Sequence, residues 1–317
     1  MQAVTIVDGH LEWREHPDPE PGTAEVLVEV RAAGLNGADR LQVAGHYPAP
    51  PGAPVDIPGL ELAGEVVALG TGSTRFAVGD RVMAVVAGGG QAERAVVHER
   101  HLLPVPEGLT WDQAGGFPEV FTTAHDALFT QCRLQMGERV LVTGAAGGVG
   151  SAAVQLALAA GASVTASVRD EGRRADVAGL AGEGAPLTVV APEQAGATGP
   201  YDVVLELVGG PNLGEDLAAL AEGGRISVIG VGAGAKAEVN LLALMGKRAR
   251  IHGSTLRARS LEDKADAARR VERQVLPLLA SGVLSVPVHA TYAMARAADA
   301  YEAFAAGGKL GKIVLTG

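Results

Sequence analysis

A glycine-rich turn between an apolar run and an alanine-rich segment constrains this chain more than any other feature of its sequence. Residues 139–161 read RVLVTGAAGGVGSAAVQLALAAG. The apolar run at the start is typical of a buried strand, and the segment after the turn is typical of a helix that ends at a glycine. A strand, a bare turn and a helix in this order favour a βαβ unit.

The chain continues this alternation from about residue 119 onward. Strand-like runs lie at 163–168, 187–190, 201–207, 225–230 and 249–254, with helical or glycine-rich connections between them. Apolar strands separated by helices indicate a parallel sheet covered on both faces. In the first third, EVLVEVRAAG (25–34) instead alternates apolar and polar residues as a half-buried strand does. We therefore predict an α/β protein that begins with a β-rich part. We also expect a helix at 122–134, a charged helix at 261–282 and a loop at the proline-rich segment 46–59.

Composition limits what the chain can bind and where it works. The 317 residues carry a formal net charge of −10, which disfavours non-specific binding to nucleic acids or anionic membranes. Cys132 is the single cysteine, so a disulfide within the chain and a thiolate metal cluster are excluded. We predict that Cys132 is a small buried hydrophobe. The N-terminus has no secretory core and no stretch is apolar enough to span a membrane, so we expect a soluble cytoplasmic protein.

The glycines of the turn suit the binding of a dinucleotide. Gly144 permits a tight turn, Gly147 lets a pyrophosphate approach the backbone, and Gly150 lets the helix pack close to the strand. The N–H groups and the dipole at the start of the helix favour the bound anion. We predict that the cofactor contacts the turn residues Gly144, Ala145, Gly147, Gly148, Val149 and Gly150.

The end of the second strand, TASVRDEGRR, bears on which nicotinamide cofactor is bound. An acidic residue here favours the ribose 2′-hydroxyl of NAD, whereas a cation favours the 2′-phosphate of NADP. Ser167 is placed nearest the ribose, and Arg169 and Arg173 follow it, so we predict NADPH. Asp170 is the competing candidate, because it could hold a ribose diol, and Arg174 is expected to face solvent.

Several stretches together resemble the zinc-independent, zeta-crystallin-like quinone oxidoreductases of the medium-chain dehydrogenase/reductase superfamily. They are GAAGGVGSAAVQLA and the segments at 32–52, 58–70 and 308–315, and the resemblance covers nearly the whole chain in order. It implies a GroES-like β-barrel catalytic domain made of residues 1–118 and 254–317, and a Rossmann NADP-binding domain at 119–253. It also implies a homodimer in which segment 249–254 is an edge strand paired with its twin.

The same resemblance implies that no zinc is bound. Zinc-dependent members carry a cysteine where GLNGAD has Asn36, and a histidine where GLE has Leu60. Their four-cysteine lobe is also missing, since AGGGQAE occupies residues 87–93. Zinc requires three or four good N, S or O ligands, and no pair of histidines here has a metal-ligand spacing.

Without a metal Lewis acid, hydride transfer to a quinone or another α,β-unsaturated carbonyl compound fits better than alcohol oxidation. The resemblance implies that Asn36 and Tyr47 line the substrate pocket, with Tyr47 hydrogen-bonding the carbonyl oxygen. Tyr47 could instead pack against prolines, and Thr122 either touches the nicotinamide or caps a helix. Further cofactor contacts are expected from Gly230, Val231 and Leu256, with Ser254 and Thr255 beside the last of these, whereas Lys309, Gly311 and Lys312 are expected to form a turn with surface charges.

Two other functions remain open. An enoyl-thioester reductase on the same fold would need a basic groove for a CoA or carrier phosphate, which Arg257 and Arg259 could begin, although a solvated loop is the simpler interpretation. A non-catalytic nucleotide-binding or RNA-binding role, as some crystallin relatives imply, is disfavoured by the acidic charge and by the presence of both Asn36 and Tyr47.

Overall fold

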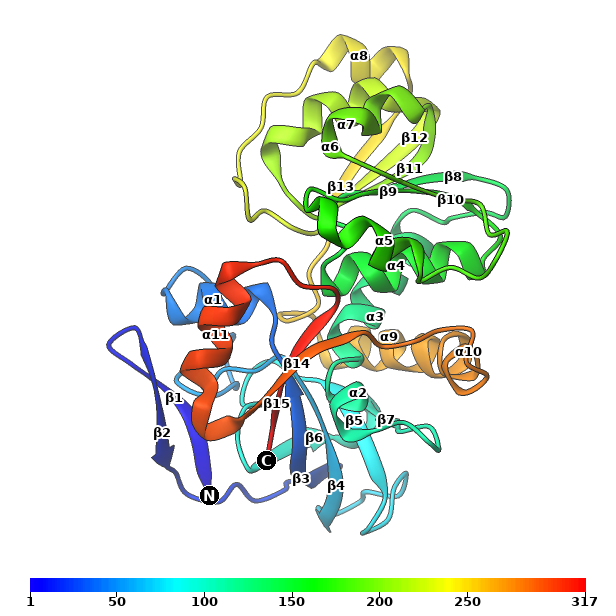
Figure 1. Cartoon of the computed structure of the whole chain (residues 1–317). Helices are drawn as coiled ribbons and strands as arrows, with labels where there is room; N and C mark the ends of the chain where they lie inside the picture. Colours follow the sequence, from blue (N-terminus) through cyan, green and yellow to red (C-terminus); the bar gives the residue numbers. More distant parts are fainter. The chain divides into compact units, whose positions relative to one another are not determined.

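The computed structural model describes all residues from 1 to 317, and the chain forms two compact units (Figure 1). The first contains residues 1–122, 256–307 and 312–317, and the second contains residues 123–255 and 308–311. The predicted boundaries were 118 and 254. The sequence did not indicate that the short segment 308–311 belongs to the second unit. No helix is both long enough and apolar enough to cross a bilayer.

The second unit is built on a parallel sheet of six strands, as predicted. The strands run in the order β10-β9-β8-β11-β12-β13. They are β8 (Arg139–Val142), β9 (Ser163–Ser167), β10 (Leu187–Val190), β11 (Tyr201–Glu206), β12 (Leu220–Val228) and β13 (Arg250–Gly253). Strand order therefore reverses between β8 and β11, which is where ligands bind in open α/β sheets.

Helices cover both faces of this sheet, with α4 and α5 on one face and α6 and α7 on the other (Figure 1). The helices are α4 (Gly148–Ala159), α5 (Arg174–Ala178), α6 (Pro192–Ala195), α7 (Leu213–Ala219) and α8 (Leu241–Gly246). Short turns of helix lie at η3 (Glu171–Arg173), η4 (Gly196–Thr198) and η5 (Gly210–Asn212). Leu141, Val204 and Ile226 from three neighbouring strands form part of the buried core.

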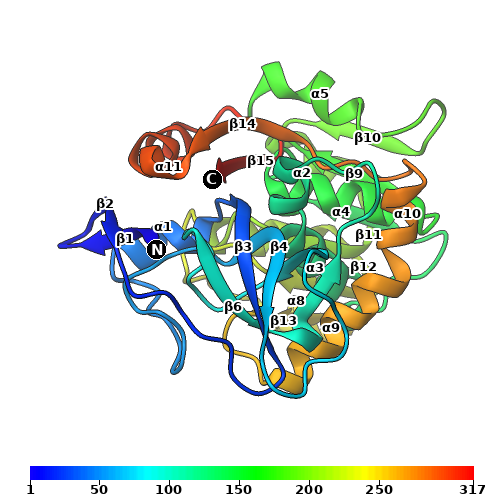
Figure 2. The ribbon, with the colours of Figure 1, turned by 90° about the horizontal axis from the view of Figure 1, so that it is seen from below.

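The first unit is mostly β. Its main sheet runs β14-β15-β3-β4-β5-β7 with β6 paired to β3, and β1 pairs with β2 apart from it. The strands are β1 (Gln2–Val7), β2 (His10–Glu15), β3 (Glu25–Gly34), β4 (Glu61–Leu69), β5 (Arg81–Val85), β6 (Arg94–His98), β7 (Leu102–Pro104), β14 (Val288–Ala293) and β15 (Lys312–Thr316). Figure 2 shows the neighbouring strands β3 and β4 of this sheet. The alternation predicted for residues 25–34 is present, because Val26, Val28 and Val30 are buried in the core.

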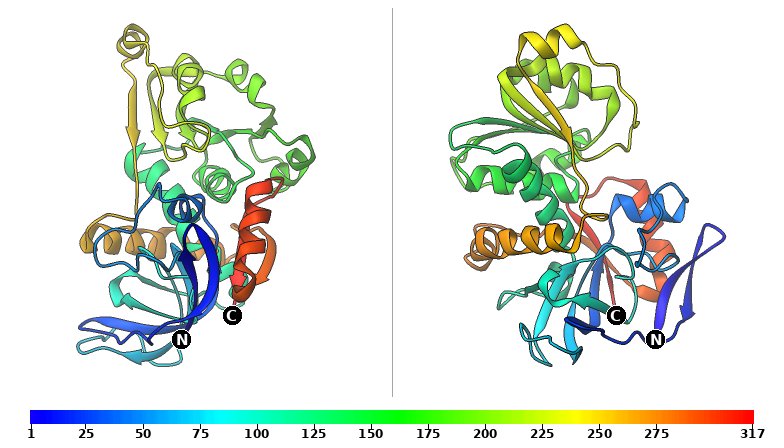
Figure 3. Two further views of the ribbon diagram at one scale, coloured as in Figure 1. Left: turned by 90° about the vertical axis from the view of Figure 1, so that its left-hand side faces the viewer. Right: turned by 180° about the vertical axis from the view of Figure 1, so that it is seen from behind.

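Helices close the first unit around this sheet. They are α1 (Gly37–Val43), α2 (Trp111–Gly115), α3 (Pro118–His125), α9 (Leu261–Gln274), α10 (Leu276–Ala280) and α11 (Ala297–Ala306), with short turns at η1 (Glu99–His101) and η6 (Met294–Arg296). Residues 123–125 of α3 already belong to the second unit. Helix α11 lies against β14 and β15 (Figure 3) and adds Ala300 and Tyr301 to the core. The proline-rich segment 46–59 contains no helix or strand, as expected.

Two predicted helices differ from the structure. The helix expected at 122–134 begins earlier, as α3, and continues as the π-helix η2 (Asp126–Gln131). The charged helix expected at 261–282 is two helices, since the chain breaks at Val275. Pro277 near the start of α10 has no N–H for the hydrogen bond that a continuous helix needs.

Candidate active site

The turn after β8 has almost no side chains, as its glycines suggest. Gly144 has φ +58°, which favours glycine, and a Cβ on Gly150 would lie 2.5 Å from the carbonyl oxygen of Gly144. Helix α4 begins after Gly147 and has no acidic residue in its first turn. The first N–H groups of a helix lack partners within it, so this end can accept an anion.

A pocket of about 640 Å³ opens beside this turn, at the carboxyl ends of the parallel strands. Gly144 and Gly147 line it after β8, and Leu207 and Val208 line it after β11, so it lies at the point where strand order reverses. The remaining lining residues are Ala146, Ser167, Val168, Arg169, Asp170, Arg173, Pro192, Glu193, Asn212, Gly232, Ala233, Gly308 and Lys309. The volume falls in the range of small-molecule and cofactor sites.

Positive charge exceeds negative charge around this pocket, with three cationic and two acidic side chains in its lining. Ser167, Arg169 and Arg173, which the sequence singled out, all belong to the lining. Arg173 is held in place, because its Nε donates to the carbonyl oxygen of Gly308 over 2.9 Å and its Nη1 to Asp176 Oδ2 over 2.7 Å. Asp170 also lines the pocket, but its Oδ1 accepts the N–H of Gly172 over 3.0 Å.

Other predicted cofactor residues lie outside the lining. Ala145 is buried and donates its N–H to the Ser167 carbonyl, 3.1 Å away. Gly230 has no room for a side chain, since a Cβ would lie 2.1 Å from the Leu207 carbonyl oxygen, and Val231 is 43% exposed. Their neighbours Gly232 and Ala233 line the pocket instead. Gly148, Val149 and Gly150 form the first turn of α4.

Thr122 and Leu256 belong to the first unit. Both line a separate small cavity of about 20 Å³ there, together with His101 and Lys264. Ser254 lies in the second unit, where its hydroxyl donates to Asp126 Oδ2 over 2.9 Å. The predicted roles of Thr122 and Leu256 beside the nicotinamide therefore remain predictions.

Sequence reasoning missed the part of the lining that follows the later strands. Pro192 and Glu193 come after β10, and Asn212 comes after β11, so the rule that ligands lie beyond strand ends could have found them. Gly308 and Lys309 carried no local signal. They reach the pocket because Gly311 donates its N–H to the Ala146 carbonyl over 2.9 Å, so Lys309 is not simply a surface charge.

In the first unit, Asn36 belongs to a buried polar cluster. Its Nδ2 donates to Glu61 Oε1 over 2.9 Å, and its Oδ1 accepts from the Nζ of Lys312 over 2.8 Å. The Lys312 ammonium group lies 2.5 Å from Glu61 Oε1, and both side chains are at least 97% buried. The expectation that Lys312 is a surface charge is therefore wrong, because Glu61 neutralises it in the interior. The amide of Asn36 is oriented from both ends.

These side chains do not suit zinc. Asn36 and Leu60 stand where zinc-dependent relatives have a cysteine and a histidine. The amide oxygen of Asn36 is bound to the ammonium group of Lys312, and Leu60 is buried and apolar. No group of three or more His, Cys, Asp or Glu side chains in the chain is arranged to hold a metal ion.

Tyr47 is held by the buried side chain of Arg257. The guanidinium lies 5.0 Å from the Tyr47 ring centroid, and its Nη1 donates to the Tyr47 carbonyl oxygen over 2.9 Å. It also donates to Gln42 Oε1 and to the carbonyl oxygen of Ala87, at 2.6 and 2.8 Å. Arg257 thus belongs neither to a solvated loop nor to an open basic groove. Burial raises the pKa of the Tyr47 hydroxyl, so it is a proton-bearing donor at neutral pH.

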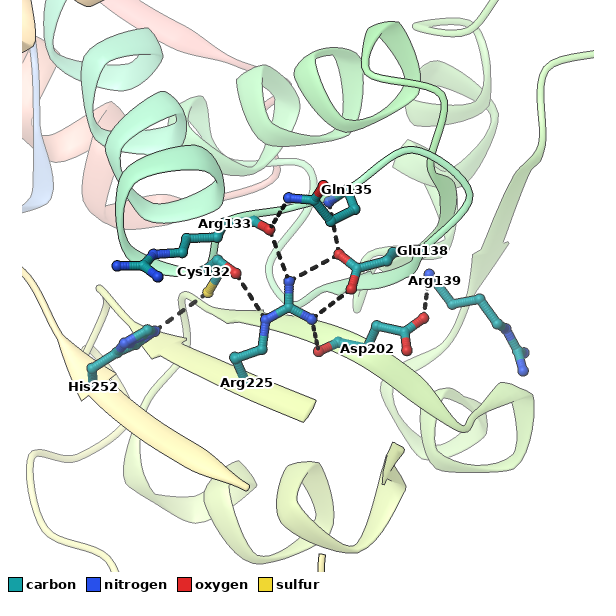
Figure 4. A network of polar contacts seen from close by, with 8 residues as sticks. All are labelled: Cys132, Arg133, Gln135, Glu138, Arg139, Asp202, Arg225 and His252. Atoms are coloured by element: carbon teal, nitrogen blue, oxygen red, sulfur yellow. Dashed lines mark hydrogen bonds and ion pairs between the residues drawn. The ribbon is translucent and has the colours of Figure 1, made fainter. Parts of the chain in front are cut away.

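Cys132 is buried, as predicted, and lies in a polar network of the second unit (Figure 4). Its Sγ is 3.4 Å from His252 Nε2, and its carbonyl oxygen accepts from Arg225, which also pairs with Glu138 over 2.7 Å. Burial raises the pKa of the Cys132 thiol to about 12. The thiolate is the reactive form of cysteine, so Cys132 is not suited to be a nucleophile.

Comparisons with known proteins agree with this architecture. The family model of the alcohol dehydrogenase GroES-like domain matches residues 22–107, and that of the zinc-binding dehydrogenases matches residues 186–315. The chain is 32% identical to the rat quinone oxidoreductase over 305 residues, which cover 94% of this chain and 90% of the rat protein. It is also 32% identical to the acryloyl-coenzyme A reductase of Metallosphaera sedula over an alignment of 348 positions, gaps included, which covers both chains fully.

Solved structures share the fold over the whole chain. The solved structure of a mycobacterial protein complexed with NADPH superposes with a TM-score of 0.87 at 26% identity, and both chains are fully covered. The predicted α/β fold, with a GroES-like domain and a parallel-sheet Rossmann domain, is therefore confirmed.

Proposed function

Because this chain belongs to the quinone oxidoreductase-like members of the medium-chain dehydrogenase/reductase superfamily, we propose that it is an NADPH-dependent reductase of quinones or other α,β-unsaturated carbonyl compounds. The observation that carries the proposal is the pocket where strand order reverses, with bare glycines on one side and Arg169 and Arg173 on another. Two similarities support the proposal: the related rat protein is a quinone oxidoreductase, and the mycobacterial protein with the same fold is complexed with NADPH.

The residues present fit a dinucleotide phosphate. A Cβ at Gly150 would meet backbone, so only glycine leaves the first turn of α4 close to the strand end, with its N–H groups open to a pyrophosphate. Arg169 can bind a 2′-phosphate through paired N–H groups, and Arg173, whose Nε and Nη1 already bind Gly308 and Asp176, can add a further N–H from Nη2. When bound, the reduced nicotinamide supplies the hydride.

In the first unit, we assign to Tyr47 the task of donating a hydrogen bond to the substrate carbonyl oxygen. Its raised pKa keeps the proton on the phenol, and Arg257 fixes the backbone and ring. A donor placed where negative charge develops stabilises the transition state more than the ground state. Both ends of the Asn36 amide are already bound, to Glu61 and to Lys312. We therefore assign to Asn36 a role in the shape of the substrate pocket rather than a hydrogen bond to the substrate. The side chains at the zinc-ligand positions, Asn36 and Leu60, are unsuited to bind zinc, so we propose a reaction that uses no zinc.

The test is a titration of the protein with NADPH and with NADH, followed by nicotinamide fluorescence, and then addition of a benzoquinone while NADPH absorbance is recorded. We expect tight binding of NADPH and quinone-dependent oxidation. Replacing the pocket arginine, Arg169→Gln, should weaken NADPH binding about 10- to 100-fold, as loss of a charged hydrogen bond does, and leave NADH binding unchanged.

Arg174→Gln is the matched control, since Arg174 lies outside the pocket lining and donates to the Val168 carbonyl oxygen. This variant should bind both cofactors like the wild type. A wild-type protein that prefers NADH would contradict the 2′-phosphate assignment and favour Asp170 as a ribose ligand.

A second candidate is reduction of an enoyl thioester, favoured by the full-length similarity to an acryloyl-coenzyme A reductase. The buried and fully engaged guanidinium of Arg257 offers no contact to a CoA phosphate. Oxidation of NADPH by acryloyl-CoA, with none by benzoquinone, would favour this candidate.

We also propose that the protein is a homodimer. Strand β13 pairs only with β12 and lies at the edge of its sheet, so its outer N–H and C=O groups can pair with a second copy. Light scattering after size exclusion should give twice the chain mass of 32.1 kDa. A mass of one chain at micromolar concentration would contradict this proposal.

A further inference from the structure

One wall of the pocket is held by a buried carboxylate at the end of β11. Glu206 is completely buried. Its Oε1 accepts the N–H groups of Val208 and Gly209, at 2.5 and 2.6 Å, and its Oε2 accepts from Nδ2 of Asn212 over 3.2 Å. One side chain thus fixes the turn from 207 to 212.

This turn also holds the loop after β12. The Val208 carbonyl accepts the N–H of Ala233 over 2.9 Å, and the N–H of Gly210 donates to the Gly234 carbonyl over 2.8 Å. Leu207, Val208 and Asn212 from the turn, and Gly232 and Ala233 from the loop, are pocket-lining residues. Glu206 is not in the lining of this pocket and acts through these neighbours.

A second carboxyl group lies against Glu206. Asp216, on α7, is 4% exposed, and its interaction with the carboxyl group of Glu206 helps to raise the pKa of its side chain. Two carboxylates cannot share a hydrogen bond without a proton, and two negative charges this close are strongly disfavoured in the interior. The proton belongs on Asp216. Three N–H donors stabilise the charge of Glu206, whereas Asp216 Oδ2 is buried with no partner that donates to it.

We propose that Asp216 is the protonated member of a buried acid pair and that, through Glu206, it positions the 207–212 wall of the cofactor pocket. The identity of the ligand rests on the proposed function, but the acid pair does not. Asp216 and Glu206 are positioning residues, since neither reaches the pocket.

The charges around Asp216 agree with this assignment. Burial, and then the hydrogen bond and charge of Glu206 and the charge of Glu215, raise the pKa of Asp216 to about 9. The other elements packed against α7 bring no free cation to it. The turns η4 and η5 and helix α8 carry no titratable side chain, and besides Glu206 strand β11 carries only Tyr201 and Asp202, neither of which is a cation. The titratable side chains on or beside β12 and α8 pair elsewhere: Glu222 with Arg248, Arg225 with Glu138, and Lys247 with the carbonyl oxygens of Ala218 and Leu220.

This pair makes stability depend on pH in a definite direction. An unfolded aspartate loses its proton near pH 4, whereas folded Asp216 keeps it up to about pH 9. The folded state therefore binds one proton more in this window, so the folding equilibrium weakens about tenfold per pH unit as pH rises through it. Asp216→Asn does not titrate, and its amide N–H can donate the same hydrogen bond to Glu206.

The first measurement is urea unfolding of the wild type and Asp216→Asn at intervals from pH 5 to pH 9. We expect the folding equilibrium of Asp216→Asn to gain about tenfold per pH unit relative to the wild type. Glu183→Gln, which removes an exposed acid elsewhere in the second unit, should follow the wild type. Parallel curves for wild type and Asp216→Asn would overturn the acid pair.

The second measurement separates positioning from stability. NADPH titrations at pH 7 and pH 10 should show about a tenfold loss of affinity in the wild type, because about a tenth of Asp216 keeps its proton one unit above a pKa of about 9. Asp216→Asn should lose far less over the same interval. Equal losses in the two proteins would overturn the positioning role. If the wild type binds no nicotinamide cofactor, the proposed function fails while the unfolding series still decides on the pair.

Discussion

Replacing Gly150 with alanine is expected to weaken NADPH binding at least about tenfold and to lower the free energy of unfolding by about 1–3 kcal/mol. In most helices this change stabilises, since glycine is the poorer helix former. At Gly150 the added methyl would lie 2.5 Å from the carbonyl oxygen of Gly144 and 2.7 Å from the Cα of Ala145. Both contacts are with backbone, so the first turn of α4 must move away from the strand end that forms the pocket.

The measurement is a fluorescence titration with NADPH together with urea unfolding of the unliganded protein. Gly214→Ala is the matched control, because Gly214 also lies in a helix of the second unit and a Cβ there meets no atom within 4 Å. This variant should bind NADPH like the wild type and be as stable or more stable. Wild-type affinity in Gly150→Ala would show that close packing of α4 is not needed for the cofactor.

The second unit was predictable because its signals are local. Strands β8, β10 and β11 are short and mostly apolar, and the glycines that shape the turn after β8 lie within seven residues of one another. Family resemblance supplied the split of the first unit between the two ends of the chain. The sequence predicts the bounds of a helix less well where a single residue interrupts it. Pro277, for example, divides the long helix expected at 261–282 into α9 and α10.

Side-chain roles were predictable only where the partner is near in sequence. Arg169 and Arg173 follow the strand end that the sequence identified, and both line the pocket. Lys309 and Lys312 are three residues apart and looked alike, yet one lines the pocket and the other is buried against Glu61. The partner of Lys312 is on β4, in a distant part of the chain, and no hydrophobic periodicity encodes such a pairing.

The pair formed by Glu206 and Asp216 shows a further limit. In the sequence, Asp216 stands beside Glu215 and resembles an ordinary acid of a surface helix. Its burial depends on how α7 packs on β11, and its protonation depends on which of two carboxylates receives the N–H donors. Neither follows from composition or spacing.

Replacing Lys312 with methionine is expected to lower the free energy of unfolding by about 3–5 kcal/mol, as removal of one member of a buried ion pair does. Methionine has a similar length but cannot neutralise Glu61, which is completely buried, or donate to the Oδ1 of Asn36. The carbonyl oxygen of Leu35, which also accepts from this ammonium group over 2.7 Å, loses a donor as well. Urea unfolding of the full chain, with the transition of each unit followed separately, measures the loss.

A double-mutant cycle tests whether the loss comes from the charge left on Glu61. Glu61→Gln removes that charge and keeps an oxygen for the N–H of Glu119, which donates to Oε2 over 2.9 Å. Combined with Lys312→Met, it should cost less than the sum of the two single changes, because the uncompensated buried charge is gone. Lys236→Met, at an exposed position, should stay within about 0.5 kcal/mol of the wild type. Strict additivity of the two buried changes would mean that Lys312 stabilises the unit by packing rather than by neutralising Glu61.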